Sequence, residues 1–247
     1  MKKKSITIII PNYNGQRLLV THLPSVFEAV RNGDQIIIAD DHSSDNSIEW
    51  LKKTYDLVEE KTPDRTDYFI FSQQIKLKEK TFDLTVILNK QNLRFAANCN
   101  QAAKLAKNEL LFLLNSDVEL QQNLFTYLLP YFDDETVFGV GCLEEENDLK
   151  GQTVLGGKNK LSFQRGMFIH QRATEMSSGP TAWVSGGSGL FDREKWQSLG
   201  GFDEAFSPAY WEDVDLSFRA RERGWKVLFE NRAKVLHNHE ATNSDVF

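Results

Sequence analysis

The sequence has few cysteines and no long apolar run, and both absences limit what the chain can be. Cys99 and Cys142 are the two cysteines among 247 residues, too few for a disulfide framework and without zinc-ligand spacing. No apolar stretch is long enough to cross a bilayer. The apolar residues 5–10 follow three lysines, but this run is too short for a signal peptide and no small-residue cleavage site follows it. We therefore expect a cytoplasmic protein.

Positive charge and glycine-rich nucleotide loops are scarce as well. The chain has 29 lysines and arginines against 35 acidic residues, a net charge of -6, which argues against a nucleic-acid partner. Neither the dinucleotide pattern Gly-x-Gly-x-x-Gly after the first strand nor Gly-x-x-x-x-Gly-Lys-Ser/Thr occurs. Any bound nucleotide must therefore be held in another way. The length and the 40% hydrophobic content suit one large α/β domain.

Apolar, β-branched runs alternate with amphipathic segments along most of the chain, which predicts an open α/β fold with a mostly parallel sheet flanked by helices. We expect strands at 5–10, 35–39, 84–88, 109–114 and 137–142, and helices at 18–30, 47–55, 95–107 and 122–131. Beyond residue 181 we expect a strand at 183–191, a short helix at 193–199, an acidic helix, and strands at 226–230 and 233–236.

Two segments interrupt this alternation. Residues 56–83 are too long for a connection between a helix and a strand. They predict an inserted β-hairpin, with a disordered loop as the alternative. Residues 151–179 are rich in Gly, Ser, Lys and Gln. We expect this segment to cross the active-site face as a flexible or hairpin cover.

Polar residues gather where the predicted strands end. Asn12 follows the first strand, Asp40 and Asp41 follow the second, and Asn115 and Asp117 follow the fourth. Ligands of open parallel sheets bind at this edge, although Asp and Asn also begin turns, a role we assign to residues 45 and 46. One carboxylate beside an amide oxygen suits Mg²⁺ or Mn²⁺ held together with a diphosphate. We therefore expect Asp117 to be a metal ligand.

Three acidic residues, Glu212, Asp213 and Asp215, open a predicted helix that ends at Gly224. Acidic residues in a first turn complement the helix dipole, so simple capping is one interpretation. The other is catalytic, because the neighbouring Trp211 would shield a carboxylate from water and raise its pKa towards that of a general base. These residues alone leave both interpretations open.

Several short polar or glycine-containing motifs follow one another along nearly the whole chain. The turn Pro11-Asn12-Tyr13-Asn14 comes first, and Asp40-Asp41-His42-Ser43-Ser44-Asp45 follows the second strand. Later come Asn92-Leu93-Arg94-Phe95-Ala96, Asn115-Ser116-Asp117, Gly200-Gly201-Phe202-Asp203-Glu204, Trp211-Glu212-Asp213 and His237. With these motifs the chain resembles the inverting family 2 glycosyltransferases, which have the nucleotide-sugar-binding GT-A fold. It departs from the family pattern at Arg94, where a glycine is usual, and at Asn115, where the metal motif begins with Asp.

The resemblance implies a single GT-A domain over residues 1–247. Residues 1–120 form the nucleotide-sugar-binding half, and 121–247 form the acceptor and catalytic half with a smaller mixed sheet. Asp213 is implied as the catalytic base with Glu212 as its alternative, and Asp117 and His237 as ligands of Mg²⁺ or Mn²⁺. The implied nucleotide-sugar-binding residues are Pro11, Tyr13, Asn14, Asp40, Asp41, Asn92, Arg94, Asn98, Ser116, Gly186, Gly187 and Trp211.

The implied function is inverting transfer of a sugar from a UDP- or dTDP-type donor to a glycan or lipid-linked acceptor. We expect it in cell-surface polysaccharide synthesis, with peripheral association at the inner face of the membrane. One alternative is a sugar-phosphate nucleotidyltransferase, but its basic, glycine-rich loop is missing after the first strand. The other is an inactive nucleotide- or glycan-binding module, against which Asp117, Asp213 and His237 argue.

Overall fold

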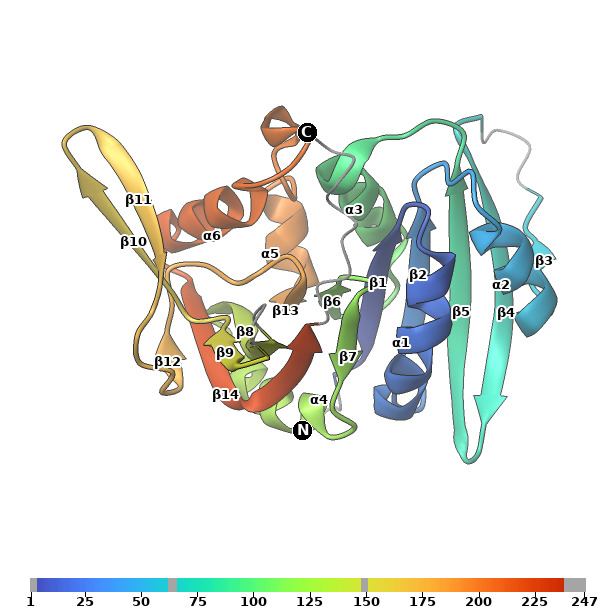
Figure 1. Ribbon diagram of the computed structural model, residues 1–247, viewed down its shortest axis with the longest axis horizontal. Helices are drawn as coiled ribbons and strands as arrows, with labels where there is room; N and C mark the ends of the chain where they lie inside the picture. The colour runs from blue at the N-terminus through green and yellow to red at the C-terminus, as the bar shows by residue number, and fades with distance from the viewer. Residues whose placement is uncertain (1–3, 62–65, 148–150, 238–247) are drawn as a thin grey trace.

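The computed structural model describes residues 4–61, 66–147 and 151–237, and its centre is one large twisted sheet (Figure 1). Within the described residues the main sheet has 12 strands. Its core consists of the four parallel strands β1 (Ile6–Asn12), β2 (Gln35–Asp40), β5 (Lys80–Asn89) and β6 (Leu110–Leu114). They lie in the order β5-β2-β1-β6. The predicted α/β fold class is therefore confirmed.

Helices cover both faces of this sheet. Successive strand residues point to opposite sides, and in the core strands both sets of side chains are apolar and need to be buried. Ile8 and Ile10 pack with α1 (Gln16–Ala29), α2 (Ser47–Tyr55) and α4 (Leu124–Leu128). Ile9 and Ile37 pack on the other side, with α3 (Arg94–Leu105), α5 (Arg193–Ser198) and α6 (Glu212–Glu222). Short 3₁₀ turns, η1 (Leu129–Asp133) and η2 (Glu204–Phe206), complete the helical layers.

The mixed strands of the second half continue the same sheet and do not form a sheet of their own. β13 (Ser188–Asp192) runs antiparallel between β6 and β8 (Val137–Asn147). β14 (Lys226–His237) pairs parallel with β8, and a register shift between Glu230 and Lys234 explains why its sequence suggested two strands. The short strands β7 (Val118–Leu120), β9 (Thr153–Gly156) and β12 (Gly179–Pro180) add to its edges.

The segment 56–83 does contain a hairpin arm, but the expected boundaries were wrong. β4 (Tyr68–Leu77) pairs with the whole of β5, whose second half is the predicted third core strand. A two-residue turn at Lys78-Glu79, with Lys78 at φ 56°, joins the arms. β3 (Val58–Glu59) pairs with β4, and residues 62–65 lie outside the described part. The insertion is thus an extension of the main sheet.

The segment 151–179 is also built from strands. Its antiparallel hairpin, β10 (Asn159–Gln164) and β11 (Met167–Arg172), forms a separate two-stranded sheet and projects beyond α6 (Figure 1). The expected strand at 183–191 begins only at Ser188. One reason is that the Val184 N–H donates to Ser217 Oγ of α6, away from the strand ladder. No helix of the described residues is both long and apolar enough to span a membrane.

One carboxylate fixes the starts of two helices. Asp45 accepts hydrogen bonds from the N–H of Gln16, the first residue of α1, and from the N–H of Ser47, the first residue of α2. Asn46 occupies the position before α2 but makes no side-chain capping bond. Asp45 therefore ties the turns after β1 and β2 together.

We predict that Asp45→Ala lowers the free energy of unfolding by about 2 kcal/mol, since each lost cap typically costs about 1 kcal/mol. Chemical denaturation measures this. Asn46→Ala is the matched control and should change stability by only a few tenths of a kcal/mol. Equal losses in the two variants would contradict the shared cap.

Candidate active site

A pocket of about 420 Å³ lies where the carboxyl ends of β1 and β6 meet the starts of α3 and α6. This volume is within the usual range for small-molecule sites. Because β1, β6 and α3 belong to residues 1–120 and α6 to residues 121–247, the pocket is lined by both halves of the chain. Thirteen predicted site residues line it: Pro11, Tyr13, Asp41, Asn92, Arg94, Asn98, Ser116, Asp117, Gly186, Gly187, Glu212, Asp213 and His237.

Three other predicted site residues, Asn14, Asp40 and Trp211, do not line the pocket. Asp40 is fully buried and accepts hydrogen bonds from Asn12 Nδ2 at 2.7 Å and from the N–H and Oγ of Ser43. Asn14 Oδ1 accepts from the N–H groups of Ser44 and Asp45. Burial raises the Asp40 pKa, although these hydrogen bonds act to lower it. In this structure Asp40 and Asn14 brace the two turns below the pocket.

Asp41 has both a structural and a pocket-lining position. Its Oδ1 accepts from the Leu93 N–H at 2.7 Å, and its Oδ2 accepts from the Arg94 N–H at 2.8 Å. These bonds hold the start of α3, where Arg94 has φ 70°. A non-glycine residue in this conformation is strained, which gives a physical reason for the usual glycine. Among the described residues, no hydrogen-bond or ion-pair partner is seen for the exposed Arg94 guanidinium.

The start of α6 is set by an unusual backbone. Tyr210 and Trp211 both have left-handed φ values, 77° and 78°. Each costs on the order of 1–3 kcal/mol and persists only where the surroundings enforce it. Asp213 is fixed by N–H donors, because Gly186 donates to its Oδ2 at 3.3 Å and Val214 to its Oδ1 at 2.8 Å. Asp215 instead pairs with Arg219 at 2.7 Å, one turn further along the helix.

The two adjacent acidic residues that α6 contributes to the pocket, Glu212 and Asp213, have elevated pKa values. Burial raises the pKa of Glu212 to about 7, and the charge of Asp213 adds to the shift, against backbone hydrogen bonds that lower it. Burial raises the pKa of Asp213 to about 6, against hydrogen bonds from Gly186 and Val214. One oxygen of Glu212, Oε2, is buried and has no hydrogen-bond partner within the part of the chain that the structure describes. Between about pH 6 and pH 7, Asp213 is therefore the one of these two groups that is mainly ionised and able to accept a proton.

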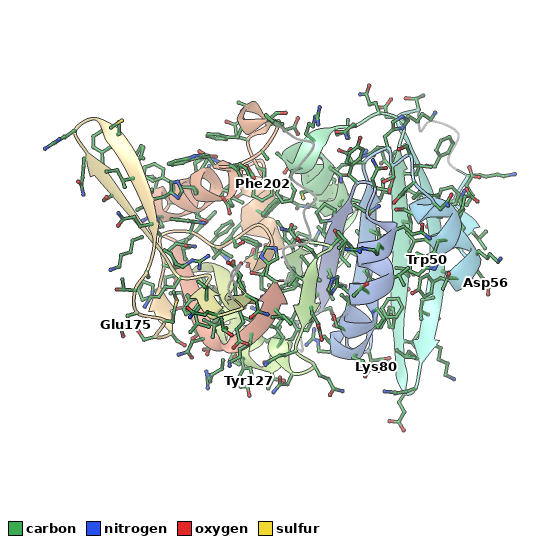
Figure 2. All side chains as sticks on the ribbon, viewed as in Figure 1. Trp50, Asp56, Lys80, Tyr127, Glu175 and Phe202 are labelled. Atoms are coloured by element: carbon green, nitrogen blue, oxygen red, sulfur yellow. The ribbon has the colours of Figure 1, made fainter. Side chains whose placement is uncertain are left out.

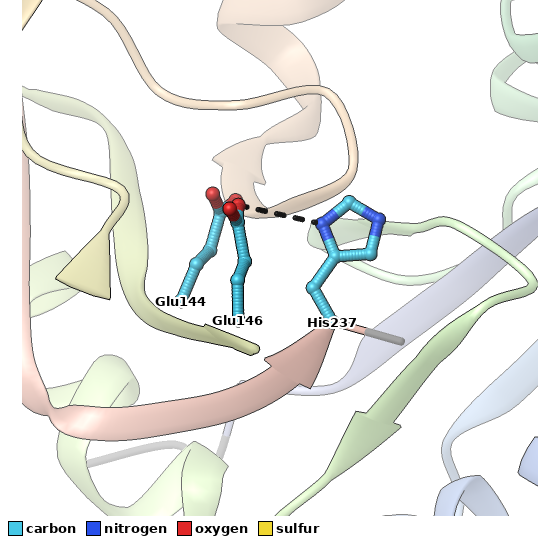
Figure 3. A group of neighbouring side chains, drawn as sticks. All are labelled: Glu144, Glu146 and His237. Carbon is cyan, nitrogen blue, oxygen red and sulfur yellow. Dashed lines mark ion pairs between the residues drawn. The ribbon is translucent and has the colours of Figure 1, made fainter. Parts of the chain in front are cut away.

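Asp117 and His237 meet in the same pocket. The strand pairing of β14 with β7 and β8 brings the two together, and His237 Nε2 lies 3.3 Å from Asp117 Oδ1. On the other side of the ring, His237 Nδ1 lies 3.9 Å from Glu146 Oε1 (Figure 3). Glu144, two residues before Glu146 on the same face of β8, completes a group whose ligand atoms with His237 lie within 4.8 Å of one another.

This donor set fits the divalent cation that the fold family implies. Asp117, Glu144, Glu146 and His237 are all half-buried, and carboxylate oxygens with one imidazole suit Mn²⁺. Burial lowers the pKa of His237, but the Asp117 hydrogen bond and the charges of the three carboxylates outweigh it, so the pKa is raised. The site thus has an excess of negative charge that a cation would offset. Arg172 also balances it by pairing with Glu146 at 3.2 Å.

The sequence analysis missed part of the lining. Ser185, Pro208, Ala209 and Tyr210 line the pocket without having been predicted, and Asn12, Phe95 and Asn115 were noted in motifs but not assigned to the site. Glu144 and Glu146 carried a usable signal, since two acidic residues spaced by two at the end of a buried strand share a face. Gly187 allows the segment before β13 to lie close to the turn after β6, because a Cβ at this position would lie 2.7 Å from Asn115 Nδ2.

Trp211 lies outside the pocket and contacts the segment 151–179, which we expected to cover the active-site face. His170 of β11 contacts Trp211 edge-on, with ring centroids 4.9 Å apart. Phe168 of β11 contacts Phe218 of α6 in the same manner at 5.9 Å. No residue of 151–179 lines the pocket. In this structure the hairpin packs on α6, so the expectation that the segment crosses the active-site face was wrong.

Comparison with known families decides what this pocket belongs to. The model of the family described as Glycosyl transferase family 2 matches residues 7–195. The chain belongs to glycosyl transferase family 2. This assignment confirms the predicted family, whose members are sugar-transferring enzymes.

Two curated relatives are similar to shorter parts of the chain. The O-antigen biosynthesis protein RfbC of Myxococcus xanthus is 28% identical over 152 residues, which is 58% of this chain and 12% of that protein. The N-acetylglucosaminyl-diphospho-decaprenol L-rhamnosyltransferase of Mycobacterium tuberculosis is 40% identical over 68 residues, 28% of this chain and 22% of that protein. The chain thus spans less than a quarter of the length of either relative.

Solved structures show the same fold. GalNAc-T7, solved with UDP, GalNAc and Mn²⁺, superposes with a TM-score of 0.66 at 18% identity, covering 96% of this chain and 44% of that one. The GT-A fold is thereby confirmed.

The elevated pKa of Glu212 predicts a pH-dependent cost to stability. The carboxyl of the unfolded chain ionises near the ordinary glutamate pKa of 4.5 and the folded one near 7, so the folded state binds more protons between these pH values. Stability therefore falls as pH rises through this window. We predict that Glu212→Gln, which cannot ionise, raises the free energy of unfolding at pH 8 by roughly 1–3 kcal/mol.

Denaturation at pH 5 and pH 8 checks this, and most of the gain should appear only at pH 8. Glu222→Gln removes an exposed charge from the last turn of the same helix and is the control. An equal gain at both pH values would mean that packing, not charge, is responsible.

Proposed function

We propose that the protein is an inverting glycosyltransferase that moves a sugar from a nucleoside-diphosphate donor, of the UDP or dTDP type, to a glycan or lipid-linked acceptor. The observation that carries this proposal is that Asp213 and Glu212 face the same pocket as Asp117 and His237. A base for the acceptor and a cation site for the leaving diphosphate are both required by such a reaction.

Asp213 is the proposed base that takes the proton of the attacking acceptor hydroxyl. Its N–H donors keep the carboxylate oriented, and its pKa of about 6 leaves it ionised under neutral to mildly basic conditions. Glu212, with a pKa of about 7, is the proposed hydrogen-bonding partner of the acceptor or of the base. Inversion follows from one displacement on the face of the sugar opposite the leaving group.

The donor is proposed to bind over the carboxyl ends of β1 and β2. Tyr13, half exposed, offers a ring face, while Asn92 and Asn98 offer polar contacts. Arg94 offers its guanidinium to the diphosphate. Asn14, Asp40 and Trp211 take part by shaping the turns and the start of α6.

The proposed cation, Mg²⁺ or Mn²⁺, is held by Asp117 and His237 Nε2, and the charge of the Glu146 carboxylate, 3.9 Å from the other ring nitrogen, favours this orientation of the imidazole. When bound, the cation offsets the charge that develops on the departing diphosphate. The Mn²⁺ in the solved GalNAc-T7 structure supports a metal of this kind.

The names of the relatives support the proposed setting. O-antigen synthesis and transfer to a decaprenyl-linked sugar both suggest cell-surface polysaccharide synthesis on a lipid-linked acceptor. We therefore propose that the protein works in the cytoplasm, at the inner face of the membrane.

A turnover assay with a panel of nucleotide sugars tests the function. We predict that Asp213→Asn keeps donor binding while turnover falls by roughly 10²-fold or more, the usual scale for losing a positioned base. Glu212→Gln should cost less. Asp215→Asn is the matched control and should cost least, because Asp215 pairs with Arg219. If Asp213→Asn turns over like the wild type, the transferase mechanism loses its base.

The rate of the wild-type enzyme should fall as pH drops through about 6, because Asp213 then becomes protonated. A nucleotide-sugar-binding module without activity would instead bind a donor but show no turnover at any pH. A nucleotidyltransferase would release pyrophosphate from a nucleoside triphosphate.

The cation proposal is tested by calorimetry of UDP and dTDP with and without Mn²⁺. We predict that binding needs the cation and that Asp117→Asn abolishes this dependence. Glu146→Gln should weaken Mn²⁺ binding by about 10-fold, as expected for a group that orients a ligand.

Glu145→Gln is the control for this experiment. It removes the same charge from the neighbouring position of β8, but Glu145 pairs with Lys234 at 2.8 Å. If UDP or dTDP binds equally well with Mn²⁺ and in EDTA, the proposed role of the metal is excluded. If Glu145→Gln weakens Mn²⁺ binding as much as Glu146→Gln does, the effect comes from the net charge of the site and not from orientation of His237.

A further inference from the structure

The β10–β11 hairpin exposes large apolar side chains at its tip. Phe163 is 64% exposed, Met167 65% and Phe168 49%, and the rings of Phe163 and Phe168 are in contact, with centroids 5.1 Å apart. They lie on a two-stranded element that projects from the body rather than in a groove (Figure 1). Exposed apolar groups gathered on a projection are typical of an interaction surface.

Charge is segregated onto the same hairpin. Residues 151–174 contain four lysines and arginines and no acidic residue, in a chain whose net charge is -6. Lys158 and Arg172 are tied to the body, by bonds to Ser177 and Glu146 respectively. Lys160 and Arg165, both exposed, have no carboxylate partner among the described residues. The tip thus combines apolar side chains with two available positive charges.

The hairpin also packs on α6 through aromatic contacts. One face of it carries His170 and Phe168, which pack on Trp211 and Phe218. Phe218 is itself 37% exposed and extends the apolar surface from the hairpin onto α6 (Figure 2 shows the side chains of this region). Whatever the tip binds is therefore brought close to α6.

We propose that the tip of the β10–β11 hairpin, formed by Lys160, Phe163, Arg165, Met167 and Phe168, is a docking surface for an anionic phospholipid membrane. Apolar side chains flanked by cations insert at the boundary between headgroups and acyl chains, where the cations meet anionic lipid. The surface goes beyond the sugar-transfer reaction and does not depend on it. It would bring α6 to a membrane-borne acceptor.

Other occupants fit the observations less well. A second copy of the chain docking through the same patch would bring two cationic tips together, and like charges oppose such a symmetric interface. A glycan is bound by aromatic side chains in a concave, mostly enclosed site, whereas this tip is convex and more than half exposed at Phe163 and Met167.

Co-sedimentation with phosphatidylglycerol–phosphatidylcholine vesicles tests the proposal, with pure phosphatidylcholine vesicles in parallel and no donor or acceptor present. We expect the wild type to bind the anionic vesicles, more weakly as NaCl is raised, and the neutral vesicles at least 10-fold less. The double variant Lys160→Gln, Arg165→Gln should bind the anionic vesicles roughly 20-fold less, about fivefold for each cation. Phe163→Ser, Met167→Ser should lose at least 10-fold on the same vesicles.

The matched control carries the same kinds of change at the opposite edge of the sheet. Val58→Ser, Lys76→Gln alters an exposed apolar residue and an exposed lysine of β3 and β4, and it should bind like the wild type. Far-ultraviolet circular dichroism of each variant verifies the fold.

Three outcomes would overturn the proposal: no preference of the wild type for anionic vesicles, equal losses in the control, or concentration-dependent dimers that the tip variants abolish. The last would identify a second copy as the partner. None of these outcomes bears on the transferase activity, which is measured separately with a water-soluble acceptor.

Discussion

The pocket depends on the burial of carboxylates at the carboxyl ends of the strands. Asp40 and Asp41 lose water contacts on folding, and N–H and amide donors replace these contacts. This is a demanding arrangement, because an unsatisfied buried charge is far more costly than an exposed one. Its result is that the turns after β1 and β2 and the start of α3 have one conformation. The side of the pocket proposed to bind the donor is therefore held in one conformation.

The side of the pocket formed by the start of α6 has the opposite character. Two left-handed residues precede α6, two adjacent carboxyls are removed from water, and one oxygen of Glu212 has no partner. Each of these features lowers stability, and all lie beside Asp213, the carboxylate proposed to accept a proton during transfer. A carboxylate that is solvated and paired would be a weaker base. The strain and the desolvation at the start of α6 are therefore consistent with the proposed role of Asp213 as a base.

Features of the fold and of the site could be predicted from the sequence where neighbouring residues along the chain determine them. The β-branched strands and the Asp117 and Asp213 motifs were readable, because strand-end residues of parallel strands meet at one edge. Asp40 could not be separated from Asp41 by pattern, since only the folded turn shows which one points into the pocket. Glu146 was missed because its position beside His237 follows from the β8–β14 register, which no local signal specifies. The segment 151–179 was misjudged because its packing on α6 arises from contacts between aromatic residues distant in sequence.

The shared strand of the β4–β5 hairpin has a practical consequence for protein engineering. β5 pairs with β2 on one side and with β4 on the other, so deleting residues 56–83 would not trim a loop but strip a neighbour from the core of the sheet. The turn at Lys78-Glu79, by contrast, is exposed and lies at the far end of both strands. A fluorescent tag or an affinity peptide inserted there would leave the pocket and the β10–β11 hairpin untouched.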